Sequence, residues 1–150
     1  MSETPFLFIF HFGISCAMVG LIWFVQVVHY PLFRLVGEKD HPSHHASHMG
    51  RTGIVVAPIM LLELFSGLAL LIIVVDPYSV YGNFFQHPKM AFASMICLVL
   101  IWLSTFLIQV PCHRALDHGK DTKAIERLIY SNWLRTLLWT ARPLLLYLSL

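Results

Sequence analysis

The chain contains few charged residues for its length, and this shortage excludes several classes of protein. Only 12% of its 150 residues are Asp, Glu, Lys or Arg, whereas 57% are hydrophobic. Such a composition is too apolar for an ordinary soluble domain. The net charge of +2 comes from basic residues that flank apolar runs, so it gives no reason to expect nucleic-acid binding. We therefore expect an integral membrane protein.

Cysteines and acidic residues are also scarce. The three cysteines, Cys16, Cys97 and Cys112, include no C-x-x-C pair, so they predict neither a disulfide framework nor a zinc–thiolate site. Only eight residues are acidic, and most of them fall between the apolar segments. No serine, cysteine or carboxylate pattern typical of a hydrolase stands out. A catalytic role, if the chain has one, must use other groups.

Four long apolar segments make up most of the sequence. A helix needs about 20 apolar residues to cross about 30 Å of hydrocarbon. Long runs without alternation exclude a membrane β-barrel. The expected fold is all-α: one domain over residues 1–150, a transmembrane four-helix bundle with helices at about 6–36, 44–75, 89–110 and 131–150.

The distribution of lysine and arginine predicts how these helices are oriented. The first loop carries Arg34, Lys39 and Arg51, and the third carries a similar cluster from Arg114 to Arg127. The second loop has only Lys89. Cytoplasmic loops are enriched in Lys and Arg. Loops one and three should therefore be cytoplasmic and both termini non-cytoplasmic.

Polar residues recur on one face of several apolar segments. Ionisable residues inside a membrane usually face a partner, a cavity or a cofactor. Depth along the helices puts Glu63 and Arg142 at the same level, so we expect an ion pair between them. The buried polar network expected at the helix interfaces consists of Glu63, Arg142, Arg51, Asn132 and Gln26.

Histidines gather toward the predicted cytoplasmic side. His29, His45, His48 and His113 should lie at one membrane level, where neutral imidazoles can ligate iron, copper or zinc. His44 is spaced i,i+4 from His48, so the sequence leaves open whether His44 or His45 faces inward. The alternative cofactor is haem b. His11 or His29 could then be the axial ligand, with Arg135 or Arg142 for the propionates.

Several motifs together resemble a family of small bacterial four-helix membrane proteins of uncharacterised function. They are HYPLF at 29–33, HHASHMGRT at 44–52 followed by Pro58 and Glu63, QVPCHRAL at 109–116, and NWLRTLLWTAR at 132–142. The resemblance spans most of the chain. It supports the four-helix fold and implies no activity.

The layout is also similar, more distantly, to that of the HemJ-type protoporphyrinogen oxidases. Those enzymes have a histidine near the start of the first helix and a lysine opening the third, both implicated in haem binding or catalysis. His11 in FHFGISCAMVGLIWF and Lys89 in HPKMAFAS stand at the matching places. The fourth helix resembles that of anthrone oxygenase-like membrane proteins. These resemblances imply a haem-binding oxidoreductase.

Three functions remain open at this point. The first is a redox protein that holds haem or a metal ion and acts on quinone or another lipophilic molecule. The second is a non-catalytic accessory subunit of a larger membrane complex or homo-oligomer, in which the polar residues only hold helices together. The third is a transporter or proton relay, for which four helices would have to oligomerise.

Overall fold

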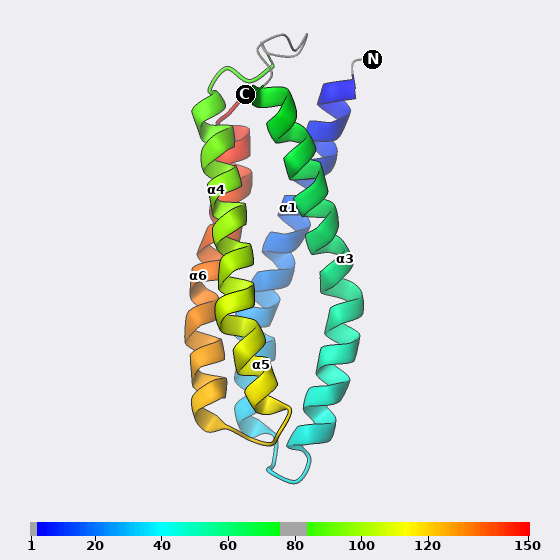
Figure 1. Cartoon of the computed structure of the whole chain (residues 1–150), viewed down its shortest axis with the longest axis vertical. Helices are drawn as coiled ribbons and strands as arrows, with labels where there is room; N and C mark the ends of the chain where they lie inside the picture. The colour runs from blue at the N-terminus through cyan, green and yellow to red at the C-terminus, as the bar shows by residue number, and fades with distance from the viewer. Residues whose placement is uncertain (1–2, 76–83) are drawn as a thin grey trace.

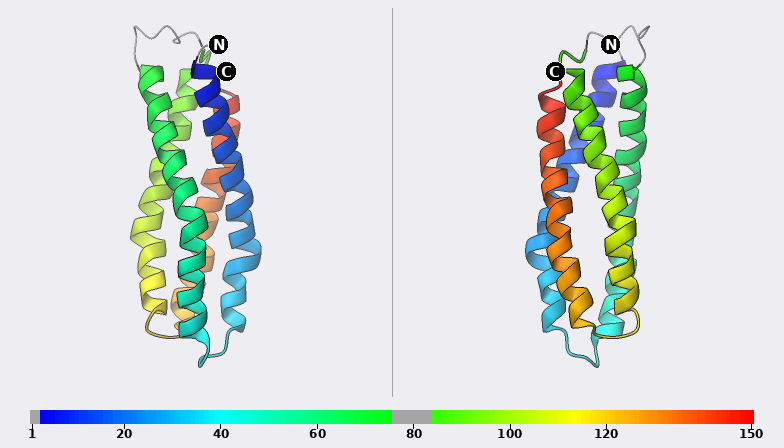
Figure 2. Two further views of the ribbon diagram at one scale, coloured as in Figure 1. Left: turned by 90° about the vertical axis from the view of Figure 1, so that its right-hand side faces the viewer. Right: turned by 60° about the vertical axis from the view of Figure 1, so that its left-hand side comes forward.

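The chain is helical throughout the part that the structure describes. This computed structural model describes residues 3–75 and 84–150, and those residues contain no strand. The all-helical class is confirmed. The helices form four long rods that lie side by side, with the two ends of the chain at the same end of the molecule (Figure 1; Figure 2).

Two rods come from the first half of the chain. The second rod is a single helix, α3 (His41–Val75), and it packs chiefly against α1 and α4. The first rod joins four helical pieces end to end: α1 (Glu3–Phe24), the π-helical turn η1 (Val25–His29), α2 (Tyr30–Leu32) and the 3-10 turn η2 (Phe33–Leu35).

The other two rods come from the second half. The fourth rod, α6 (Thr122–Tyr147), packs against both α4 and α1. The third rod consists of α4 (Pro88–Ser104), the π-helical turn η3 (Thr105–Gln109) and α5 (Val110–Leu116). The short connections of residues 36–40 and 117–121 lie together at the end of the molecule opposite the termini (Figure 1).

Both π-helical turns come directly before a proline-containing helix start. Pro31 and Pro111 each follow the last residue of a π turn by two positions. Proline has no N–H to donate to the preceding turn, so the helix must widen or break there. The wider turn rotates the following residues relative to a regular helix, and it carries His29 and Gln109, which both belong to the polar interior.

Three of the expected helix boundaries are wrong. α3 begins at His41 rather than at 44, and Ser43 lies within its first turn, where its Oγ donates to the Asp40 carbonyl (3.0 Å). The third rod continues past 110 to Leu116 because the π turn accommodates Pro111. α6 begins at Thr122 rather than at 131, because Asp121 caps it.

Three rods are long and apolar enough to span a membrane: Pro5–Leu35, His41–Val75 and Pro88–Leu116. The fourth expected span is not among them, since α6 carries several charged residues. Its exposed charges lie in the first turns, at Lys123 and Arg127, and the two arginines further along the helix are turned inward. Arg135 and Arg142 are buried, whereas Leu137 and Leu144 on the opposite side are about 60% exposed. A soluble helix shows the reverse pattern, so this arrangement suits an apolar surrounding.

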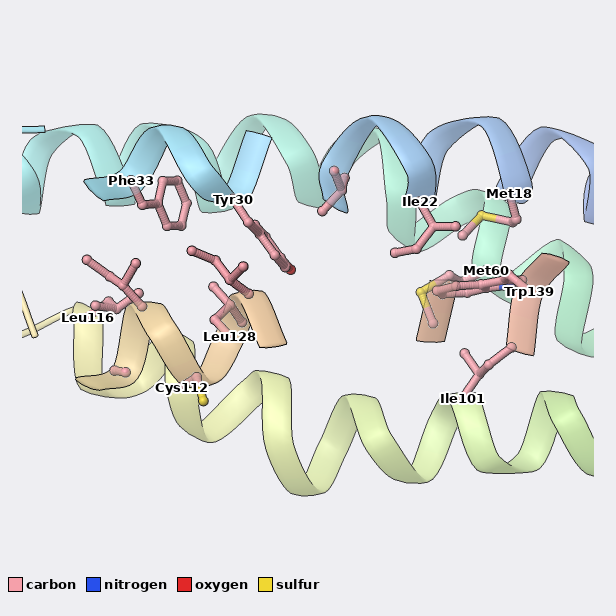
Figure 3. Packing of buried hydrophobic residues seen from close by; sticks show 14 residues of the cluster. Met18, Ile22, Tyr30, Phe33, Met60, Ile101, Cys112, Leu116, Leu128 and Trp139 are labelled. Carbon is pink, nitrogen blue, oxygen red and sulfur yellow. The ribbon is translucent and has the colours of Figure 1, made fainter. Parts of the chain in front are cut away.

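Apolar side chains fill the interior between the polar layers. Met18, Ile22, Met60, Ile101 and Trp139 form one end of a continuous buried cluster (Figure 3). Tyr30, Phe33, Cys112, Leu116 and Leu128 form its other end. Each rod contributes to this cluster, so it fixes the distances between rods and holds the polar side chains in place.

Asp121 is the clearest local determinant of α6. Its Oδ1 accepts hydrogen bonds from the backbone N–H groups of Lys123 (2.9 Å) and Ala124 (3.1 Å). Loss of such a cap costs about 1 kcal/mol. We expect Asp121→Ala to lower the unfolding free energy in detergent micelles by about this amount, and Asp121→Asn to change it little. Equal losses in both variants would show that charge, and not capping, stabilises this end.

At the same end, Arg34 and Glu126 form a bidentate pair across the first and fourth rods. Arg34 Nε and Nη2 donate to the two carboxylate oxygens, each at 2.6 Å. These bonds stabilise the ionised carboxylate and lower the pKa of Glu126. The pair is accessible to solvent, so it specifies how the rods align more than it stabilises them.

Candidate functional site

The molecule has apolar side chains on its outside and many polar ones inside. Glu63, Arg142, Asn132 and His11 are completely buried, whereas residues such as Ile54, Phe65 and Leu107 are largely exposed. In water this arrangement would be very unfavourable, because buried charges and exposed apolar surface both raise the free energy. The buried polar groups fall into three layers along the rods.

The first layer surrounds Glu63. Its Oε1 accepts from Ser15 Oγ (3.0 Å) and forms an ion pair with Arg142, and its Oε2 accepts from Trp139 Nε1 (2.9 Å). The sequence-based expectation of a Glu63–Arg142 ion pair is confirmed. Arg142 Nε also donates to the Ser94 carbonyl (3.2 Å), so this layer ties all four rods together.

His11 belongs to the same layer. Its Nδ1 lies 2.8 Å from Ser66 Oγ, and its Nε2 lies 3.1 Å from Arg142 Nη2. Because the guanidinium can only donate, Nε2 must be the acceptor. Both ring nitrogens therefore have partners within the protein. Gly67 packs on the ring, since a Cβ built there would lie 3.0 Å from His11 Cε1.

The second layer joins the first and fourth rods. Asn132 Nδ2 donates to Gln26 Oε1 (2.9 Å), and Gln26 Nε2 donates to the Ile129 carbonyl (3.2 Å). Arg135 Nη1 donates to Asn132 Oδ1 (3.1 Å), and its guanidinium lies 4.9 Å from the Trp139 ring centroid. The expected network members Gln26, Asn132 and Arg142 thus lie in the two inner layers.

Two predicted site residues lie outside these layers. Arg51 is exposed on α3, so its assignment to the buried network is wrong. Twelve residues at 100° each place it about 120° around the helix from Glu63. Lys89 is exposed in the first turn of α4, away from the buried side chain of His11, so the structure does not bring these two residues together.

The third layer is an imidazole cluster, formed by His29, His45, His48 and His113 near the end opposite the termini. These are the four histidines that the sequence predicts for a metal site, and the structure brings them together from η1, α3 and α5. His29 Nε2 and His48 Nδ1 face each other in a short contact, and Thr52 Oγ1 lies 3.0 Å from the same His48 nitrogen. The His48 and His113 ring centroids are 5.6 Å apart.

The second pair in the imidazole cluster consists of His45 and His113, and an acidic side chain lies beside it. His45 Nε2 lies 3.1 Å from His113 Nδ1, and His45 Nδ1 lies 3.1 Å from Asp117 Oδ1. The carboxylate beside Nδ1 favours a proton on that nitrogen, although Nδ1 makes no hydrogen bond in this geometry, and Nε2 then accepts a hydrogen bond from His113 Nδ1. His45 is 1% exposed and His44 is exposed, which decides the alternative that the sequence left open.

Three residues near the cluster were missed by sequence reasoning. Phe33 packs edge-on against His48, with ring centroids 4.9 Å apart. His41 is 1% exposed, and neither of its ring nitrogens has a hydrogen-bond partner. Asp117 was read as a loop residue. The only signal for it was its place four residues after His113, which puts both on one side of a helical turn.

A metal ion can be tested against this geometry. Within residues 3–75 and 84–150, no group of three or more His, Cys, Asp or Glu side chains is spaced as a metal site. The imidazoles approach in pairs. Two imidazoles on one tetrahedral ion with bonds of about 2.0–2.1 Å have nitrogens roughly 3.3 Å apart. The 3.1 Å between His45 Nε2 and His113 Nδ1 is close to this value.

A cavity of about 200 Å³ opens beside the imidazole cluster, between α3 and the rod of η3 and α5. Its apolar wall includes Val56 and Met60, and its rim includes the exposed Gly53 and Ala57. Its polar lining includes Tyr30, Thr52, Gln109, Arg135 and two histidines of the cluster, His48 and His113.

The fold and the site thus define a class: an all-helical chain with three membrane-length rods and layered polar groups inside. Comparison with protein-family models, curated proteins and solved structures finds no match for this chain. Functional inference therefore depends on the geometry alone.

Proposed function

We propose that this protein is a transmembrane four-helix bundle that binds a metal ion at the imidazole cluster and acts as a redox protein on a lipophilic molecule. The observation that carries the proposal is the His45–His113 pair, with Asp117 on the remaining nitrogen of His45. Carboxylate–histidine–metal arrangements of this kind recur in metalloproteins. Neutral imidazoles suit zinc, copper and iron.

The proposed membrane orientation places this cluster at the cytoplasmic surface of a bacterial inner membrane. Lysine and arginine concentrate in the connections at the cluster end, including Arg34, Lys39 and Lys120. The positive-inside rule assigns this end to the cytoplasm. Both termini then lie on the other side, and α6 becomes the fourth span because Arg135 and Arg142 are enclosed by the other rods and its exposed charges, Lys123 and Arg127, lie in its first turns at the cytoplasmic end.

The geometry supports a metal ion better than haem. His11 Nε2 accepts from the buried Arg142 guanidinium, so an axial bond at this nitrogen would have to displace a cation, and Nδ1 is held by Ser66. The cavity of about 200 Å³ is also smaller than the roughly 300–1,000 Å³ of pockets that enclose drug-sized ligands. Haem binding through His11, Lys89, Arg135 and Arg142 stays a prediction that these contacts do not favour.

Each residue of the cluster has a distinct part in this proposal. His45 Nε2 and His113 Nδ1 share a hydrogen bond that a metal ion would replace, and the Asp117 carboxylate beside His45 Nδ1 would favour the tautomer that leaves Nε2 free to ligate. His29 and His48 form the neighbouring pair, and the Phe33 ring keeps water from this side of the cluster. A bound redox-active ion would supply one-electron chemistry that these side chains lack.

The test is an absorption spectrum with metal analysis on protein purified in mild detergent from a host without added metals. We expect near-stoichiometric iron or copper and no Soret band; zinc, which has no redox chemistry, would support the metal site but contradict its redox role. Folded protein that is colourless and metal-free would contradict the proposal. It would favour an accessory subunit. The Glu63 layer supports that alternative, because the polar atoms of this layer bind one another and join the rods.

The contribution of Asp117 can be measured separately. Asp117→Ala leaves His45 without the group that fixes its tautomer, and loss of such partners typically lowers metal affinity about 10- to 100-fold. The measurement is competition with a chelator of known affinity. Asp40→Ala, on the neighbouring connection, is the matched control and should bind as the wild type does. Equal affinities in all three proteins would contradict the role of Asp117.

A further inference from the structure

Arg135 is a buried cation without a counter-ion. It is 5% exposed, and its Nε has no hydrogen-bond partner. Its contacts are neutral: Asn132 Oδ1 at 3.1 Å, the Trp139 ring and the Tyr30 hydroxyl. Within the described ranges, the ion pairs of arginine are Arg34–Glu126 and Arg142–Glu63, and neither includes Arg135. A buried charge is normally paired, because an isolated one is costly.

The cavity beside Arg135 offers a place for the missing negative charge. Arg135 and Tyr30 line it together with His113. Tyr30 Oη lies 3.4 Å from His113 Nε2 and also interacts with the Arg135 guanidinium, so the two groups present their polar atoms to the cavity together. Most of the remaining wall is apolar and comes from α3. The lining therefore combines cationic and hydrogen-bonding groups with a surface suited to a hydrocarbon chain.

We infer that this cavity binds a long-chain carboxylate, with its head group on Arg135 and Tyr30 and its chain leaving past Gly53 and Ala57 into the bilayer. Arginine recognises a carboxylate through charge-assisted hydrogen bonds, often two at once. Gly53 and Ala57 leave the rim open because they have almost no side chain. The occupant supplies the charge that pairs with Arg135.

The depth of Arg135 favours a fatty acid over a phospholipid. Arg135 is thirteen residues from the start of α6, which corresponds to about 20 Å along the helix. A phospholipid head group stays charged and remains at the membrane surface. A fatty acid can cross hydrocarbon as the neutral acid and ionise beside the guanidinium. The cavity of about 200 Å³ also suits a carboxyl group and part of a chain better than a glycerophosphate.

The carboxylate site adds a substrate class to the proposed redox function. Its role as a substrate site rests on that proposed function. The cavity also touches His48 and His113 of the imidazole cluster. A carboxylate bound there would lie next to the proposed metal. Binding of the carboxylate itself requires only Arg135 and the cavity, so it can be tested on protein without metal.

The test is equilibrium binding of radiolabelled oleate to delipidated, chelator-treated protein. Arg135→Gln should weaken binding about tenfold or more, because a charge-assisted contact is lost. Gly53→Leu should block the cavity. A Cβ at Gly53 meets nothing within 4 Å, so the variant should fold. Gly50→Leu is the matched control: Gly50 has the same open surroundings, lies outside the cavity lining and should bind normally.

Two results would overturn the inference. One is equal oleate binding by the wild type, Arg135→Gln and Gly53→Leu. The other is displacement of oleate by phosphatidylglycerol at lower concentration than by oleate itself, which would assign the site to a phosphate. Metal content measured on untreated portions separates the two proposals. Metal without oleate binding overturns only the carboxylate site, and oleate binding without metal overturns only the metal centre.

Discussion

Replacement of Arg142 by methionine should destabilise the protein by about 3–5 kcal/mol, the cost of leaving a buried charge without its partner. Glu63 and Arg142 are both completely buried and form an ion pair. Methionine keeps much of the arginine stem but removes every donor. Glu63 then keeps only Ser15 and Trp139, while Ser94 and His11 lose a partner.

A double replacement distinguishes the ion pair from simple packing. Glu63→Gln/Arg142→Met removes both charges, so it should recover a large part of the stability lost in Arg142→Met. Unfolding by sodium dodecyl sulfate in mixed micelles measures these differences. Arg127→Met, which changes an exposed arginine on the same helix, should have little effect. A double variant less stable than Arg142→Met would show that the negative charge of Glu63 is tolerated without Arg142, which contradicts the ion pair as the source of the stability.

Loss of metal from His113→Ala is the second large effect that we expect. His113 comes from α5, whereas His45 and His48 come from α3, so His113 joins separate rods in the imidazole cluster. Alanine removes one nitrogen of the His45–His113 pair, whose separation is close to that expected for two ligands of one metal ion. Because removal of supporting residues alone costs 10- to 100-fold, we expect loss of a ligand to lower affinity by more than about 100-fold.

His118→Ala provides the matched control for this effect. His118 lies five residues further along the same segment, is exposed, and takes no part in the cluster. Metal content after identical purification should equal that of the wild type. The account would be contradicted if His113→Ala and His118→Ala retained equal amounts of metal, because the binding site would then lie elsewhere.

Much of the helical organisation follows from patterns that the sequence displays. The apolar runs predict the rods because a membrane-length helix needs only composition and length. The Glu63–Arg142 pair was predictable because rise per residue fixes depth. The same arithmetic placed His29, His45, His48 and His113 at one level. Depth along a helix is therefore read well from sequence.

The side of a helix that a residue faces is predicted less well from sequence. Arg51 has a suitable depth but points outward. The π turns η1 and η3 rotate the residues that follow them around the helix axis. A regular 100° periodicity does not predict this rotation. Asp117 and His41 were missed because their roles depend on how connections fold against the rods. The cavity beside Arg135 depends on the spacing of rods, which no single segment encodes.

X-ray absorption at the edge of the bound metal tests the central claim most directly. The account predicts a first shell of nitrogen at about 2.0–2.1 Å if the ion is zinc, with the outer-shell scattering typical of imidazole rings and a contribution from at least two histidines. In His113→Ala that outer-shell scattering should fall with the metal content. A first shell of oxygen alone, or of sulfur, would contradict a metal centre built on the imidazole cluster.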